Sequence, residues 1–337
     1  MKPRITVLMP VFNAADYLRE AIESILGQTY CDFEFLIIND GSEDRSEEII
    51  LSYKDKRIRY FRNEKNAGIA ATLNRGIELA ATEYIARMDA DDIAHPERLH
   101  WQVDTMDNHP ELGVVGGYMQ IIGNKKEIWK VPLSHREILA SFPFQNPFFH
   151  PTVMIRKDVL IRNKLYYNPS CLHMEDYELW YRMRNLTRFM NLNKIILLFR
   201  YAGQNITVRK KDEKEKKINS FIREILTGMN IPCSNREEEL HFEFANKILR
   251  KPIRQTLDRY KEWYLALLNA NRQKGGFPEP EFSGKLMQLW LNTFYLLLDE
   301  KYGPEIIEYF FSLCRQLQVP WRHLCVMEYR HLKHRLF

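Results

Sequence analysis

Short apolar runs alternate with amphipathic segments from the start of the chain to about residue 203. The run FEFLIIND at residues 33–40 is nearly continuous, which is typical of a strand whose two faces are both covered. Leu18, Ile22 and Ile25 recur at helical spacing after the first run, and Asn13 is placed to cap that helix. The same pattern predicts strands at residues 4–12, 33–40, 57–63, 83–91 and 194–203, and further helices at residues 45–53, 69–81 and 171–184.

This order of elements predicts an α/β fold built on a doubly wound sheet. Beyond about Asn205 the character changes, because a charge run and several helical periodicities replace the alternation of strands and helices. We therefore expect one domain at residues 1–207 and a helical domain at residues 208–337. The helices expected in the second domain lie at residues 237–249, 256–269, 285–299 and 305–317.

Composition narrows the class of protein. The 337 residues carry a net charge of +5, which is too weak to indicate a nucleic-acid partner. The five cysteines are odd in number and scattered, which argues against a disulfide framework and a zinc site and favours a reducing compartment. The first apolar run breaks at Pro10 and Asn13, so it predicts a strand and not a signal peptide. Later apolar runs are too short to span a bilayer, and we expect a cytoplasmic protein.

Polar residues follow three of the predicted strands, where an open α/β sheet binds its ligands. They are Asn13, the triplet Asp40-Gly41-Ser42 and the triplet Asp89-Ala90-Asp91. For Asp40, two interpretations stay open: a turn helped by Gly41, or a carboxylate that accepts a hydrogen bond from a base. Neither a G-x-G-x-x-G sequence nor a P-loop sequence is present, so dinucleotide and P-loop phosphate binding have no support.

The aspartate triplet has a solvated acidic loop as its plain alternative. Its place at the end of a predicted strand favours a binding site, because strand alternation points Asp89 and Asp91 to the same side. Two carboxylates there can hold Mg²⁺ or Mn²⁺, and a diphosphate would complete the coordination shell. We therefore expect a divalent cation that binds together with a nucleotide.

Five ordered motifs make the pattern specific: VLMPVFNAADYLREAIESILGQTY, FEFLIINDGSEDRSEEII, NEKNAGIAATLNRGIELA, EYIARMDADDIAHPERL and MEDYELWYRM. In this order and spacing they resemble the family 2 glycosyltransferases of the GT-A fold, over roughly residues 5–207. The resemblance implies a mixed, Rossmann-like sheet flanked by helices, here followed by a helical C-terminal appendage.

The resemblance also implies a role for each residue that matches a family motif. Asp91, together with Asp89, would hold Mn²⁺ or Mg²⁺. Asp176, in preference to Glu175, would be the catalytic base, although charge at a helix start is the plain alternative for this pair. Residues that would contact the nucleotide sugar are Pro10, Val11, Phe12, Asn13, Asp40, Asn66, Gly68, Asn74, Arg87 and Asp89.

Two further positions concern the acceptor or the diphosphate. His150 matches such a position, and a loop histidine with a structural hydrogen bond is the alternative. Arg200 follows the last predicted strand, where relatives often carry a histidine two residues later that completes the metal site. Here Tyr201 and Ala202 stand in that place, so the metal has fewer protein ligands, or Arg200 or Gln204 steadies the phosphate.

The implied reaction is an inverting transfer from a nucleotide diphosphate sugar, a UDP-sugar being favoured, to a hydroxyl of a saccharide or lipid-linked saccharide. The implied setting is the biosynthesis of surface polysaccharide, lipopolysaccharide or capsule. A sugar-phosphate nucleotidyltransferase is a weaker alternative, because no glycine-rich basic segment follows the first strand. A non-catalytic nucleotide-sugar-binding or scaffolding protein is the alternative from another class.

The last stretch, VPWRHLCVMEYRHLKHRLF, is basic and amphipathic. Such a helix can lie on an anionic membrane, and a terminal helix packed on the core with a solvated basic face is the plain alternative. The membrane interpretation would place the protein at the inner face of the cytoplasmic membrane, where a lipid-linked acceptor would lie.

Overall fold

The computed structural model describes residues 3–123, 126–201, 211–231 and 233–327, without the side chains of residues 211–216. The chain divides into two compact units. The α/β unit comprises Met1–Ile138 and Asn146–Lys217, and the helical unit comprises Leu139–Gln145 and Ile218–Phe337. The sequence placed a single boundary after Thr207. In the structure the division falls after Lys217, and a short internal segment belongs to the helical unit.

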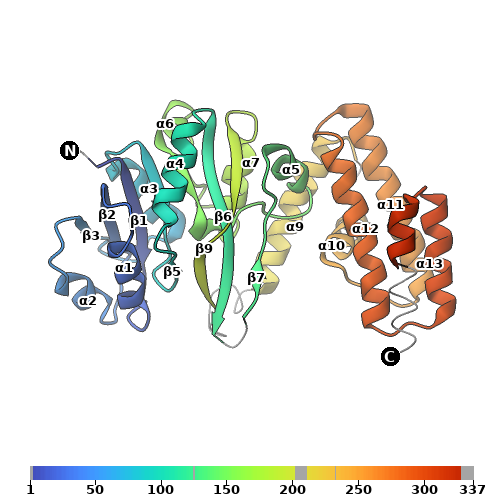
Figure 1. Ribbon diagram of the computed structural model, residues 1–337, viewed down its shortest axis with the longest axis horizontal. Coiled ribbons are helices and arrows are strands. Elements are labelled where there is room, and N and C mark those ends of the chain that lie inside the picture. The colour runs from blue at the N-terminus through green and yellow to red at the C-terminus, as the bar shows by residue number, and fades with distance from the viewer. Residues whose placement is uncertain (1–2, 124–125, 202–210, 232, 328–337) are drawn as a thin grey trace. The chain divides into compact units, whose positions relative to one another are not determined.

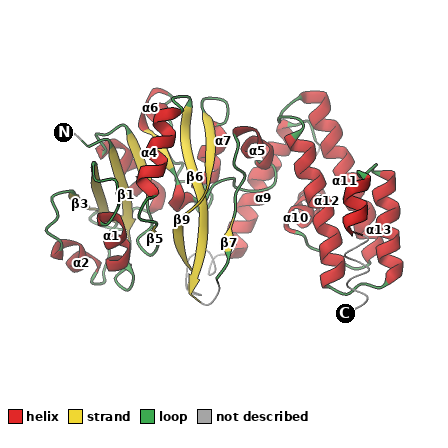
Figure 2. Ribbon diagram, in the orientation of Figure 1, coloured by secondary structure: helices red, strands yellow, loops and turns green. Residues whose placement is uncertain are grey.

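The α/β unit is built on one mixed sheet of nine described strands (Figures 1 and 2). Their order is β3-β2-β1-β4-β8-β6-β9-β5, with β7 paired to β6. The first four strands of this order run parallel, and β8 lies antiparallel to both β4 and β6. The strands are β1 (Ile5–Val11), β2 (Phe33–Asn39), β3 (Ile58–Arg62), β4 (Tyr84–Arg87), β5 (Ile93–Ala94), β6 (Leu112–Gly123), β7 (Ile128–Trp129), β8 (Met154–Arg156) and β9 (Arg188–Tyr201).

Helices connect these strands at most of the places that the apolar spacing predicts. One difference is α4 (Arg98–Asn108), which had no counterpart in the predicted elements. Its buried residues include Leu99, Val103 and Met106, which recur at helical spacing. The other helices of this part of the chain are α1 (Leu18–Leu26), α2 (Ser46–Ser52), α3 (Ile69–Leu79), α5 (His135–Ser141), α6 (Lys157–Arg162) and α7 (Glu175–Met183), with a 3₁₀ turn at His150–Thr152.

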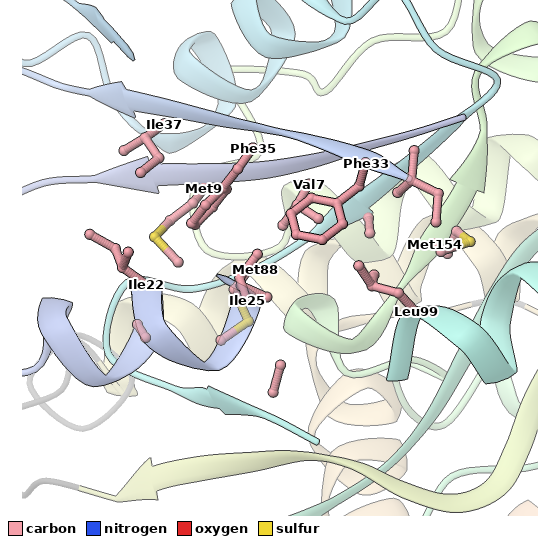
Figure 3. Close-up of a cluster of buried hydrophobic side chains, with 14 of the residues drawn as sticks. Val7, Met9, Ile22, Ile25, Phe33, Phe35, Ile37, Met88, Leu99 and Met154 are labelled. Atoms are coloured by element: carbon pink, nitrogen blue, oxygen red, sulfur yellow. The ribbon is translucent and has the colours of Figure 1, made fainter. Parts of the chain in front are cut away.

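A cluster of fully buried side chains ties α1 to the central strands (Figure 3). Met9 of β1 and Phe35 of β2 pack with Ile22 and Ile25 of α1, and Met88 joins them from the end of β4. Burial of one side chain of this size stabilises the fold by about 1.5–3 kcal/mol. The cluster therefore fixes the carboxyl ends of the three strands that carry the polar residues.

The register of the sheet sets where those polar residues emerge. Val11 of β1 pairs with Asn39 of β2, and Leu8 pairs with Arg87 of β4. Because β1 lies between β2 and β4, the loops that follow these two strands leave the sheet on either side of β1. The topology alone thus brings the loops that begin at Asp40 and Met88 to one edge.

The helical unit has its own aromatic core. Trp290 is fully buried, and its ring stacks on that of Phe310 with 4.9 Å between the centroids. Phe144, from the internal segment, stacks on His241 at 5.4 Å. No helix in the described ranges is both long and apolar enough to cross a bilayer. The helices are α9 (Lys211–Gly228), α10 (Asn235–Asn246), α11 (Ile253–Lys274), α12 (Glu281–Asp299) and α13 (Pro304–Gln316).

The closest approach of a helix to the sheet can be tested at Gly76 of α3. A Cβ atom there would lie 2.3 Å from Cδ1 of the buried Leu8, so Gly76→Ala forces the two elements apart. We expect the free energy of unfolding to fall by about 1–3 kcal/mol. Gly284→Ala in α12 is the matched control, because it makes the same change in a helix with open space around the new methyl group. Equal thermal unfolding shifts for the two variants would contradict the close packing.

Candidate functional site

Three aspartates gather directly after β4. Asp89, Asp91 and Asp92 each place a carboxylate oxygen within 4.8 Å of the others. Asp92 is fully buried, whereas Asp89 and Asp91 are partly exposed. Burial and the neighbouring Asp89 raise the pKa of Asp91 to about 6. Burial, Asp89 and Asp91 together hold the pKa of Asp92 well above its ordinary value. The cluster therefore gathers negative charge at an electrostatic cost.

Arginines supply the compensating charge. The buried Arg87 donates from Nη1 to Asp89 at 2.5 Å. Arg98 of α4 is fully buried and donates from Nη2 to the carbonyl oxygen of Arg87 at 2.6 Å. Burial and the charge of Arg87 lower the pKa of Arg98 to about 9. Two buried cations thus lie beneath the acidic loop, and their own repulsion is offset by the carboxylates above them.

The acidic cluster fits a divalent cation. Oδ1 of Asp92 accepts a hydrogen bond from the backbone N–H of Arg200 at 2.9 Å, and its buried Oδ2 has no hydrogen-bond partner. An unpartnered carboxylate oxygen beside two other carboxylates is suited to a hard cation such as Mg²⁺ or Mn²⁺. The sequence named Asp89 and Asp91 as ligands, and the geometry adds Asp92 as a third candidate.

Asp40 ties the loop after β2 to the loop between β3 and α3. Its oxygens accept from Nδ2 of Asn63 at 2.6 Å and from the backbone N–H groups of Ala67 and Gly68 at 2.9 and 3.0 Å. Gly41 has φ 73°, and a Cβ there would lie 2.7 Å from the backbone nitrogen of Asn66. The backbone of Gly41 thus has the conformation that the turn interpretation needs, whereas the carboxylate of Asp40 binds the loop after β3. Its contact with a base stays a prediction.

The residues at the end of β1 divide into two kinds. Pro10 and Val11 are buried in the strand, and their contact with a nucleotide stays a prediction. Phe12 is 46% exposed and Asn13 is exposed too. Asn13 does not cap α1, which begins at Leu18.

Asn13 instead holds the β1 loop against the β2 loop. It adopts φ 49°, a left-handed conformation that asparagine tolerates better than most residues. Its Oδ1 accepts from the backbone N–H of Glu43 at 2.9 Å, and its own backbone N–H donates to Oγ of Ser42 at 3.0 Å.

Asn74 also has a role that the sequence did not reveal. Its amide group donates to the carbonyl oxygen of Tyr167 and accepts from the backbone N–H of the same residue, both at 2.8 Å. The hydroxyl of Tyr167 lies 3.0 Å from Nε2 of His150. Burial and the charge of Arg87 lower the pKa of His150 well below its ordinary value, so its imidazole is neutral. The structural hydrogen bond left open for His150 is thus present, while a contact of Asn74 or His150 with a substrate stays a prediction.

The two acids at the start of α7 differ sharply. Glu175 is 7% exposed, and its Oε2 has no hydrogen-bond partner. Burial and the neighbouring Asp176 raise the pKa of Glu175 to about 7. Asp176 is partly exposed and accepts a hydrogen bond from Nδ2 of Asn146 at 2.7 Å. Arg87 favours the charged forms of both Glu175 and Asp91, so this pair and the acidic cluster share one cation.

Arg200 reaches the acidic cluster from β9. Its Nε donates to the carbonyl oxygen of Asp91 at 3.2 Å, and its Nη2 donates to Glu20 at 2.9 Å. Its guanidinium carbon lies 4.4 Å from the centre of the Tyr17 ring. These contacts place Arg200 beside the aspartates, and its contact with the acceptor or the diphosphate stays a prediction. Ala202 and Gln204 lie outside the described residues.

Sequence reasoning missed three residues that the structure brings to the site: Asn63, Arg98 and Asn146. Asn63 follows β3 and is one more polar residue at a strand end, so the rule that found Asp40 could have found it. Arg98 lies beside Leu99 on the buried stripe of α4. Asn146 left no comparable signal, because its partner Asp176 is 30 residues away.

Comparison with known proteins identifies the family. The model of glycosyl transferase family 2 matches residues 6–163. An uncharacterized glycosyltransferase of Haemophilus influenzae is 31% identical over 285 residues, which cover 77% of this chain and 88% of the relative.

Two solved structures share the fold. S. aureus TarS in complex with UDP-GlcNAc gives a TM-score of 0.56 at 18% identity, over 94% of this chain and 91% of that one. The mannosyltransferase PcManGT from Pyrobaculum calidifontis, in complex with GDP-Man and Mn²⁺, gives 0.54 at 15% identity, over 94% and 87%. These findings confirm the GT-A fold and set aside the nucleotidyltransferase and scaffolding alternatives. The chain belongs to glycosyl transferase family 2 and is a glycosyltransferase of the GT-A fold.

Proposed function

We propose that the enzyme transfers a sugar, with inversion, from a nucleotide diphosphate sugar to a hydroxyl of a saccharide or lipid-linked saccharide. One observation carries this proposal: Glu175 and Asp176, adjacent in sequence, have opposite environments, and Glu175 shares Arg87 with the acidic cluster. A transferase of this kind needs an ionised base for the acceptor and a positive environment for the leaving diphosphate. The acids of α7 offer the base, and the acidic cluster with Arg87 offers a place for positive charge beside the diphosphate.

Asp176 is the catalytic base of this proposal. Where two neighbouring acids have environments that push their pKa values apart, the pair divides the roles of acid and base. The buried Glu175, with a pKa of about 7, holds a proton more readily than a solvated carboxyl group. Asp176 keeps access to solvent and accepts the Asn146 hydrogen bond, which favours its charged form. Attack by an acceptor hydroxyl that gives its proton to Asp176 displaces the diphosphate directly, and direct displacement inverts the anomeric carbon.

Asp89, Asp91 and Asp92 would hold Mn²⁺ or Mg²⁺. When bound, the cation would act as a Lewis acid that offsets the charge growing on the diphosphate. Arg87 holds Asp89 in place, and Arg200 fixes both the backbone of Asp91 and the carboxylate of Asp92. A divalent cation and a nucleotide-sugar donor are also supported by the related structures, which were solved with UDP-GlcNAc and with GDP-Man and Mn²⁺.

The nucleotide would lie along the loops that follow β1 and β2. Phe12 and Asn13 offer exposed side chains there, and Asp40 holds the loop after β3 at Ala67 and Gly68. A UDP-sugar is the favoured donor, in keeping with the UDP-GlcNAc bound to TarS. A panel of UDP-, GDP-, CMP- and dTDP-sugars with Mn²⁺ tests this choice, because the correct donor raises the thermal unfolding midpoint by mass action.

The physiological setting belongs to the same proposal. A lipid-linked acceptor in the biosynthesis of surface polysaccharide, lipopolysaccharide or capsule would bring the cytoplasmic enzyme to the inner face of the membrane. Trp321 is 77% exposed and Val326 48% exposed, close to the basic end of the chain. Residues 328–337, which carry most of that basic charge, lie outside the described residues.

The assignment of the base is tested by Asp176→Asn. We expect it to lower kcat by about 100-fold or more, because it removes a proton acceptor while it keeps the shape of the side chain. Donor affinity, measured by calorimetry, should be unchanged. Glu175→Gln is the matched control and should lose far less activity, since Glu175 holds a proton at neutral pH more readily than an ordinary carboxyl group. An active Asp176→Asn beside an inactive Glu175→Gln would move the base to Glu175.

The acidic cluster is tested by Asp91→Ala. In the presence of Mn²⁺ we expect the affinity for the nucleotide donor to fall by at least about tenfold, or about 1.4 kcal/mol. Without added cation, the variant and the unmutated enzyme should bind the donor alike. Asp158→Ala, an exposed aspartate paired with Arg162, is the control that removes one carboxylate elsewhere. Calorimetry that finds no effect of Mn²⁺ on the unmutated enzyme would remove this role.

Membrane contact is tested by flotation with liposomes. We expect the full chain to float with vesicles that contain anionic phosphatidylglycerol and to stay behind with phosphatidylcholine alone. Neutralising the basic end with Arg330→Gln, Lys333→Gln and Arg335→Gln should abolish flotation. If the triple variant still floats, this segment is not what holds the protein to the vesicle.

A further inference from the structure

The hydrogen-bond partner of the catalytic base is held in one orientation. Nδ2 of Asn146 donates to Oδ2 of Asp176 at 2.7 Å, while Oδ1 of Asn146 accepts from the backbone N–H of Phe148 at 3.2 Å. The second bond decides which end of the amide faces the carboxylate, because a flipped amide would place two donors together. Asn146 can therefore only donate to Asp176 in this geometry.

The chain reaches Asn146 directly from the helical unit, whose internal segment ends at Gln145. Two residues before Gln145, the carbonyl oxygen of Pro143 accepts a hydrogen bond from Nε2 of His241 at 2.7 Å. Nδ1 of His241 accepts in turn from Nε1 of Trp263 at 3.2 Å. His241 is fully buried, and burial lowers its pKa to about 4. A neutral imidazole has one donor and one acceptor nitrogen, and both are used here.

Aromatic packing fixes the next residue of the segment. The ring of Phe144 stacks on His241 at 5.4 Å and lies 5.8 Å from Phe282, measured between centroids. The helical unit therefore holds the backbone at Pro143 and the side chain of Phe144. Asn146 begins the next segment of the α/β unit.

We propose that Asn146 is a positioning residue that orients Asp176 and favours its ionised form. The proposal rests on the function assigned above to Asp176. A hydrogen bond donated to a carboxylate stabilises its charged form and fixes its rotamer, and both effects serve a base that must face an acceptor hydroxyl.

Other titratable groups also act on Asp176. In the described part of the chain, Glu175 and Tyr177 interact with it from α7, and Tyr167 interacts with it from the preceding loop. Arg87 of β4 acts on both Glu175 and Tyr167. Asn146 is uncharged, so its replacement by alanine leaves these charges in place and removes a single donor. The effect of Asn146→Ala on the protonation of Asp176 therefore isolates the hydrogen bond.

The experiment is a titration of ¹³C-labelled aspartate carboxyl groups by NMR, with the Asp176 signal assigned from its absence in Asp176→Asn. In Asn146→Ala we expect the titration midpoint of Asp176 to rise by about one pH unit. Asn108→Ala is the matched control, since Asn108 also donates to an aspartate, Asp104, but on an exposed helix. It should leave the Asp176 midpoint unchanged. An unchanged midpoint in Asn146→Ala would overturn the positioning role.

Measurements of turnover distinguish a failure of the proposed function from a failure of the positioning role of Asn146. The substrate is the nucleotide sugar that stabilises the enzyme best. In Asn146→Ala, the pH below which its hydrolysis slows should move to a higher value, with KM for the donor unchanged. A shifted NMR midpoint in a protein that hydrolyses no nucleotide sugar would refute the proposed function and leave the contact between Asn146 and Asp176 established. A lowered rate without any shift of the pH profile would refute the positioning role alone.

Discussion

The structure depends on the balance of charge beneath the loop that follows β4. Three carboxylates within 4.8 Å of one another would repel strongly if nothing opposed them. Arg87 opposes them by an ion pair, and Arg98 opposes them from a fully buried position without taking a carboxylate of its own as a hydrogen-bond partner in the described structure. Neither arginine could be buried in this way without the acids, and the acids could not be brought so close without the arginines. The protein thus holds an acidic site ready for a cation.

The order of the strands supports this balance of charge. The ion pair lies at the end of β4, which is parallel to β1 on one side and antiparallel to β8 on the other. The backbone N–H of Arg87 donates to the carbonyl oxygen of Val153, directly before β8, so the antiparallel strand holds the arginine from its far side. A purely parallel sheet would not place a chain of this direction there. The mixed topology therefore supplies both the edge at which the loops meet and the support for the cation beneath them.

The sequence predicted the first four strands of the chain, the polar residues at strand ends and the acidic pair of α7, because each of these leaves a local pattern. It did not predict what these residues bind within the protein. Asn74 bonds to Tyr167 across 93 residues and Asp40 bonds to Gly68 across 28, and no periodicity records such a pair. Asn13 was placed wrongly as a helix cap because its left-handed backbone conformation depends on the Ser42 and Glu43 loop. Arg98 could have been found, since its neighbours Leu99 and Val103 mark a buried helical stripe.

The geometry of α7 gives Glu175 and Asp176 different environments, and the proposed choice of Asp176 as the base follows from this difference. Two adjacent acids are equivalent by composition, but a helix turns by about 100° per residue, so they cannot face the same surroundings. Glu175 shares its stripe with Leu179 and Met183, which are both fully buried, and it is therefore turned into the core. Asp176 is turned away from that stripe toward Asn146. The same apolar spacing that packs α7 thus buries Glu175 and raises its pKa, while it leaves Asp176 partly exposed, as the role proposed for Asp176 requires.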